Sequence, residues 1–153
     1  MRRKEKEITD RSEIDSILKE AQVCRIALAR GNEPYLVPVF FGYDGSRLYF
    51  HTAIEGRKLD FIAANNRICF EAELNVNLAP DSSEACRWSV SFESVIGYGK
   101  TIEMLTPEEK EYGLNQIMLH YSGKKWRFTP EALKRTRVWC VEIESITGKR
   151  SKP

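Results

Sequence analysis

The stretch VCRIALARGNEPYLVPVFFGYDGSRLYFHT, residues 23–52, decides the fold. It begins with apolar residues alternating with polar or small ones, which is typical of a half-buried strand. A turn at 31–34 leads into a second apolar strand over 35–43. Asp44-Gly45 then predicts a hairpin back into a third strand over 47–52. Three consecutive strands joined by short turns favour an antiparallel sheet over a parallel one.

The rest of the chain adds strands and a few marginal helices. Apolar spacing and capping signals predict a helix after Asp10, a short helix after Gly56, a helix after the capping box at Thr106 and a helical turn at 129–131. Further strands are predicted over 67–76, 88–104 and 137–146. The strand over 88–104 is expected to bend near Gly97 and Gly99. About six antiparallel strands with helices at the margins predict a mainly β fold, a small closed or partly closed barrel. The length of 153 residues fits a single domain spanning 1–153.

Composition excludes several classes of protein. Hydrophobic residues make up 42% and charged residues 30%, which is a globular balance. No apolar run approaches the roughly 18 residues of a membrane span, and the charged N-terminus is not a secretory signal. The net charge of +2 is spread without a basic stripe, so no dedicated nucleic-acid role is expected. The short basic tail at 148–153 is expected to be a frayed end.

The cysteines and histidines indicate a reduced protein without a metal site. The four cysteines have no CxxC spacing, and three lie inside apolar patterns, so we expect reduced thiols in a cytoplasmic protein. His51 and His120 are the two histidines of the sequence and lie in unrelated contexts. A zinc site would have to be assembled from scattered positions, and none is predicted.

One local constellation points to an anion. The strand ending in His51-Thr52 is followed by a loop and then by Gly56-Arg57-Lys58 at a predicted helix start. A hydroxyl, free backbone amides and two cations within one loop suit a phosphate monoester. The alternative is an exposed helix start with solvated cations. His51 itself is either a structural strand histidine or a functional group beside this loop.

These residues form part of a longer resemblance. The ordered segments Val37-Pro38-Val39-Phe40, Leu48-Tyr49-Phe50-His51-Thr52, Gly56-Arg57-Lys58-Leu59, Ile68-Cys69-Phe70-Glu71 and Ser94-Val95-Ile96-Gly97-Tyr98-Gly99 resemble the pyridoxamine-phosphate-oxidase-like flavin-binding proteins. They look closest to the nitroimidazole-resistance branch. The resemblance covers roughly residues 10–147 and is more specific for the family than for one reaction.

The resemblance implies an antiparallel split β-barrel homodimer that binds FMN in two clefts between its subunits. Transferred residue by residue, the resemblance implies that Lys58, with Arg57 and Thr52, would hold the phosphate. The isoalloxazine ring would be flanked by the backbones of Val37, Pro38, Val39, Phe50 and His51. The partner subunit would contribute Trp88, Ser94 and Val95. His51 matches the histidine that this branch places near the flavin. The sequence has no counterpart of the C-terminal substrate-binding extension of true pyridoxamine phosphate oxidases, so that substrate is not expected.

The leading interpretation is an FMN-dependent oxidoreductase, with nitroreduction as a candidate activity and His51 as the catalytic polar group. A flavin-binding module without turnover is the first alternative. A haem-binding split barrel, with His51 or His120 as the iron ligand, is the second. The physiological substrate and electron donor are not encoded in any motif of this sequence.

Overall fold

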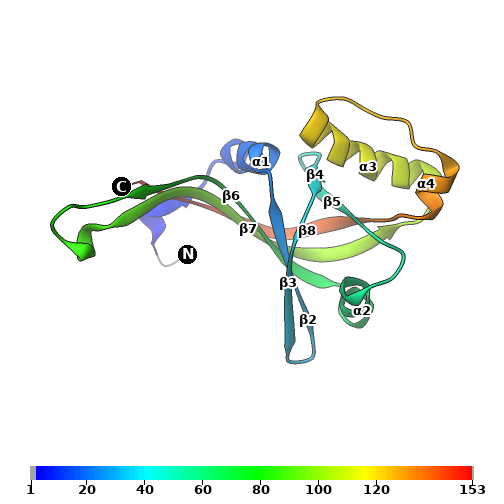
Figure 1. Cartoon of the computed structure of the whole chain (residues 1–153), viewed down its shortest axis with the longest axis horizontal. Helices are drawn as coiled ribbons and strands as arrows, with labels where there is room; N and C mark the ends of the chain where they lie inside the picture. Colours follow the sequence, from blue (N-terminus) through cyan, green and yellow to red (C-terminus); the bar gives the residue numbers. More distant parts are fainter. Residues whose placement is uncertain (1–2, 153) are drawn as a thin grey trace.

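The computed structural model describes residues 3–152, so the predicted domain of 1–153 extends at both ends beyond the described residues. Figure 1 shows long curled strands with helices at the margins. The strands are β1 (Glu7–Ile8), β2 (Cys24–Arg30), β3 (Glu33–Val39), β4 (Phe41–Tyr43), β5 (Arg47–Thr52), β6 (Arg67–Ala79), β7 (Ser89–Met104) and β8 (Arg137–Ser151). The helices are α1 (Arg11–Glu20), α2 (Arg57–Ala64), α3 (Pro107–Ser122) and α4 (Pro130–Lys134), with 3₁₀ turns at Lys4–Lys6 and Ala85–Arg87.

All the strands belong to one antiparallel sheet in the order β3-β2-β6-β7-β8-β5-β4, with β1 added along β8. The two ends of this order, β3 and β4, are separated in the chain by Phe40 alone. The chain therefore passes directly from one edge of the sheet to the other, which requires the sheet to curl. The predicted antiparallel split barrel is confirmed. The single strand predicted over 35–43 is wrong, because its two halves pair with β2 and β5 on opposite edges.

Two irregularities bend the long strands. β6 runs three residues beyond its predicted end, and its pairing with β7 shifts between Leu74 and Asn77, where Asn75 has a positive φ of 54°. The pairing of β7 with β8 shifts between Tyr98 and Gly99, and the additional residue lies on β8 at Glu144. The bend predicted near the glycine pair is thus confirmed as a bulge. The β6–β7 hairpin extends away from the body of the sheet (Figure 1).

The helices cover the sheet from two sides. The Asp10 side chain caps α1 by accepting from the Ser12 N–H at 2.8 Å, and α1 buries Ile14, Ile17 and Leu18 in the main core. α3 lies over β4, β5 and β8, where a second apolar cluster forms (Tyr49, Met104, Leu114, Ile117, Val138 and Cys140). α3 approaches β4 so closely that a Cβ on Gly42 would lie 2.3 Å from the Gln116 carbonyl carbon. Only glycine fits at this contact.

The C-terminal segment is ordered, contrary to the expectation of a frayed end. β8 continues to Ser151, pairing with β7 on one side and with β1 on the other, and β1 was not predicted. Ser151 is buried, and its hydroxyl accepts from the Lys6 ammonium at 2.8 Å. The frayed-end prediction is therefore wrong for residues 148–151, while Pro153 lies outside the described residues. Within residues 3–152, none of the helices combines the length and the apolar character needed to cross a membrane.

Candidate functional site

The predicted phosphate-binding residues lie where β5 ends and α2 begins. We call His51, Thr52, Arg57 and Lys58 the β5–α2 site. Along β5, Thr52 is buried and His51 is exposed, as expected for alternating sides of a strand. Gly56 precedes α2 with φ 139°, a conformation that favours glycine. No side chain among the described residues caps α2. The Leu59 N–H donates to the Gly56 carbonyl at 2.9 Å, whereas the N–H groups of Arg57 and Lys58 have no partner among the described residues.

Lys58 is the cation of the site that has no ion-pair partner among the described residues. Its side chain is half-buried, and burial lowers its pKa below the ordinary value of 10.5. Among residues 3–152, no carboxylate lies within ion-pair distance of its ammonium. Although part of the His51 side chain is exposed, desolvation of the rest, followed by repulsion from Lys58, lowers the pKa of His51 below 6.5. His51 is therefore neutral at neutral pH, and the site carries an uncompensated positive charge.

Arg57, in contrast, is already engaged with β3. Its guanidinium donates to Glu33 at 2.6 Å and lies 5.2 Å from the centre of the Tyr35 ring. The hydrogen bonds from Arg30 and then from Arg57 lower the pKa of Glu33. Arg57 thus anchors the start of α2 to the first residue of β3 and adds positive potential from a fixed position. Both predicted cations lie at the site, but Arg57 already has an ion-pair partner and Lys58 has none among the described residues.

The Thr52 hydroxyl is also engaged within the protein. It donates to the Ala53 carbonyl at 2.8 Å and accepts from the Trp139 indole N–H at 3.1 Å. Trp139 stacks against the buried ring of Phe50 with centroids 6.5 Å apart, and the Arg137 guanidinium lies 5.0 Å from the centre of the Trp139 ring.

Arg137 is fixed in turn by a bidentate ion pair with Glu103, at 2.7 and 2.6 Å. Sequence reasoning missed Glu103, Arg137 and Trp139 as supports of this site. The available signal was the i, i+2 spacing of Arg137 and Trp139 on a predicted strand. This spacing places both side chains on the same face of the sheet, where side chains of a neighbouring strand can contact them.

Of the residues predicted to flank the flavin ring, Phe50 and His51 lie on β5, and Val37, Pro38 and Val39 lie farther along β3. Val37 is half-buried against the main core, Val39 is buried and Pro38 is exposed. Pro38 and Val39, with Gln22, Val23 and Phe40, line an open and mostly apolar pocket of about 260 Å³. This pocket lies at the last residues of β3, whereas Arg57 contacts Glu33, the first residue of the same strand. β3 therefore connects the two predicted halves of the flavin site.

Trp88, Ser94 and Val95 are not brought to the β5–α2 site within one chain. Trp88 is 54% exposed beside the β6–β7 hairpin, which lies at the opposite end of the molecule from α2 (Figure 1), and its indole donates to the Asp81 carbonyl. Ser94 is half-buried on β7, and Val95 is fully buried in the core of its own chain. Their role as contacts from a partner subunit stays a prediction.

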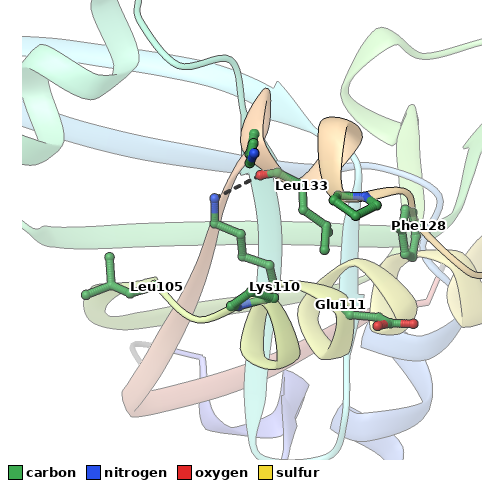
Figure 2. Close-up of a pocket in the computed structure, with 8 residues that line it drawn as sticks. Leu105, Lys110, Glu111, Phe128 and Leu133 are labelled. Carbon is green, nitrogen blue, oxygen red and sulfur yellow. Dashed lines mark hydrogen bonds between the residues drawn. The ribbon is translucent and has the colours of Figure 1, made fainter.

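His120 and Cys24 contribute to the packing of the protein interior. The His120 Nε2 lies 2.7 Å from the Ala21 carbonyl, and the His120 ring packs against Phe41. All four cysteines are free thiols, and burial raises the pKa of Cys24 to about 12. In the described part of the chain, no three His, Cys, Asp or Glu side chains gather as a metal site would require. A pocket of about 440 Å³ between α3 and α4 (Figure 2) contains none of the predicted flavin contacts.

The comparisons with known proteins agree with the fold. The family model described as pyridoxamine 5'-phosphate oxidase matches residues 10–150. The chain belongs to the pyridoxamine 5'-phosphate oxidase family. A protein of solved structure, described as a candidate 5-nitroimidazole antibiotic resistance protein from Bacteroides thetaiotaomicron, is 32% identical, with a TM-score of 0.84 over 94% of this chain and 86% of that one.

A more distant protein of solved structure shares the fold. The FAD- and haem-binding protein of Mycobacterium smegmatis has a TM-score of 0.85 at 18% identity, over 97% of this chain and 74% of that one. An uncharacterised Rhizobium meliloti protein is 27% identical over 64 residues. That match spans 42% of each of the two proteins, so less than half of this curated relative is covered.

Proposed function

We propose that this chain is an FMN-dependent oxidoreductase whose β5–α2 site binds the flavin phosphate. The observation that carries the proposal is Lys58, a half-buried ammonium without a carboxylate partner among the described residues, beside an uncapped helix start. Burying an unpaired charge costs free energy, which an anionic ligand returns through charge-assisted hydrogen bonds. The backbone N–H groups at the start of α2 supply further donors for phosphate oxygens. The residues present therefore fit the phosphate end of FMN.

The family and the pocket at the end of β3 support the rest of the cofactor. Pro38, Val39 and Phe40 offer an apolar surface to a planar ring, while the 32% identical nitroimidazole resistance relative supports nitroreduction as the activity. Bound flavin would supply hydride or electron transfer, and the protein would supply orientation and electrostatics. His51, neutral at neutral pH, has one N–H to donate and one nitrogen to accept. A phosphate at Lys58 offsets the ammonium's repulsion and raises the pKa of His51 toward the working range of a proton donor.

The outer face of the sheet supports a homodimer. Strand register places Leu36, Ala27, Cys69 and Tyr98 in one row across β3, β2, β6 and β7. Leu36 is 64% exposed and Tyr98 51% exposed, and α3 covers the other half of this sheet. A two-fold interface buries such a face most simply, and an interface that completes a flavin cleft should bury on the order of 2,000 Å² or more. Sedimentation should give a dimer at micromolar concentration; a monomer with FMN bound would contradict the shared cleft.

Turnover tests the activity. The FMN-loaded protein is mixed with reduced nicotinamide nucleotide and a 5-nitroimidazole, and loss of the nitro absorbance is followed against a flavin-free control. We expect FMN-dependent consumption of both reactants. Retained FMN without reduction by the donor or transfer to the nitro compound would identify a binding module instead. A haem spectrum in the purified protein would favour the haem-binding alternative.

A further inference from the structure

A pocket of about 440 Å³ lies between the start of α3 and the short helix α4, away from the β5–α2 residues. Five apolar side chains form most of its wall: Leu105, Pro107, Phe128, Pro130 and Leu133. Lys110, Glu111 and Lys134 add the polar groups. Figure 2 shows Leu105, Lys110, Leu133 and Phe128 around this hollow. Its volume lies within the range of small-molecule sites, and its mixture of apolar wall and few polar groups is typical of them.

The wall of this pocket is held in place by hydrogen bonds. The Lys110 ammonium donates to the Leu133 carbonyl at 2.9 Å (Figure 2). It also donates to the Thr136 carbonyl at 3.0 Å, and the two bonds fix the end of α4 against α3. The Thr129 hydroxyl caps α4 by accepting from the Ala132 N–H. Phe128 and Leu133 pack onto the second apolar cluster. The hollow is therefore preformed rather than a gap between loose segments.

The segment between α3 and α4 is fixed by a buried side chain. Asn115 is 7% exposed, and its amide oxygen accepts from the Trp126 N–H at 2.7 Å while its amide N–H donates to the Trp126 carbonyl at 3.1 Å. This reciprocal pair holds the connection that leads into Phe128. Both sides of the pocket are thus anchored to α3.

The charged side chains that line the pocket are Lys110, Lys134 and Glu111, so the lining carries one more positive than negative charge. Within the described residues, none of these three takes part in an ion pair. Lys110 uses two of its three N–H groups for carbonyls and keeps one for a ligand. Leu105, at the edge of the pocket, is 72% exposed, which is a large apolar surface to leave in water.

We propose that the pocket between α3 and α4 binds a small carboxylate with an apolar body, such as a medium-chain or aromatic acid. The apolar part lies against Leu105, Phe128 and Leu133, and the carboxylate faces Lys110 and Lys134 at the rim. This site is separate from the proposed flavin phosphate site. Its occupancy requires no redox step and involves none of the predicted flavin contacts.

Calorimetric titration with octanoate tests the proposal on the purified full chain. We expect saturable binding that weakens at least tenfold in Leu105→Trp, which fills the pocket from an exposed position. Lys134→Glu should lower the affinity for octanoate about fivefold. A single exposed charge contributes modestly to binding, and reversing its sign doubles the change in electrostatic free energy. The affinity for the neutral analogue 1-octanol should be the same in Lys134→Glu and the parent.

Two matched variants separate local from general effects. Leu78→Trp makes the same change at a residue that is 71% exposed on β6, and Lys19→Glu makes the same charge change on α1. Both should bind octanoate within twofold of the parent. Absence of saturable binding, or equal affinity in Leu105→Trp and the parent, would overturn the site. Equal octanoate affinity in Lys134→Glu and the parent would overturn the assignment to carboxylates.

Discussion

Replacing Lys58 by Met should weaken FMN binding roughly tenfold to a hundredfold. The change removes one charge-assisted contact to phosphate, which contributes about 1.5–3 kcal/mol, and keeps the apolar stem of the side chain. The upper half of this range is expected, because the ammonium is half-buried and no carboxylate among the described residues competes for it. The flavin-free variant should be at least as stable as the parent, since it no longer buries an unpaired charge.

Flavin fluorescence titrations with FMN and riboflavin measure this effect. Riboflavin lacks the phosphate, so its affinity should be nearly the same for the parent and Lys58→Met. Arg57→Met is the matched control: Arg57 is paired with Glu33, so a smaller loss of FMN affinity is expected there. An unchanged FMN affinity in Lys58→Met would place the phosphate elsewhere. Equal losses for FMN and riboflavin would show that Lys58 shapes the protein rather than binding phosphate.

Three further predictions follow from the contacts. His51→Gln should keep FMN affinity within about threefold and reduce turnover roughly 10²- to 10⁴-fold, as for loss of a proton donor; unchanged steady-state rates would remove His51 from the reaction. Gly42→Ala should destabilise the fold by about 1–3 kcal/mol in urea unfolding, because its Cβ would lie 2.3 Å from the Gln116 carbonyl carbon; an unchanged midpoint would contradict that contact. Burial lowers the pKa of His120 below 6.5 and outweighs the raising effect of its bond to Ala21. Below about pH 6.5 the unfolded state therefore binds more protons than the folded state, and the free energy of unfolding falls as the pH drops. His120→Gln should reduce this pH dependence in unfolding measurements, and an identical pH profile would show that His120 does not contribute.

The features predicted correctly from the sequence depend on neighbours in the chain. The Asp10 cap and the Thr106 capping box each involve residues at most three positions apart, and both are present. The Asp44-Gly45 turn likewise carries its own signal, with Asp44 accepting from the Arg47 N–H. The alternation within 23–30 was enough to assign the buried side of β2. Local sequence therefore determined most of the elements.

The features that were missed depend on residues far apart in the chain. Arg57 is engaged by Glu33, 24 positions away, and Thr52 by Trp139, 87 positions away. One sequence gives no signal for either contact, so Lys58, Arg57 and Thr52 looked equally available for phosphate. The break at Phe40 was hidden for a similar reason: 35–43 is apolar throughout most of its length, and only the curl of the whole sheet separates β3 from β4.

The most direct test of a phosphate-binding flavin site is gel filtration of the purified chain after separate incubations with equal amounts of FMN and of riboflavin, with flavin absorbance recorded across each protein peak. FMN should elute with the protein, whereas riboflavin should elute separately from it. A protein peak without FMN, or one that retains riboflavin as fully as FMN, would contradict a phosphate-binding flavin site.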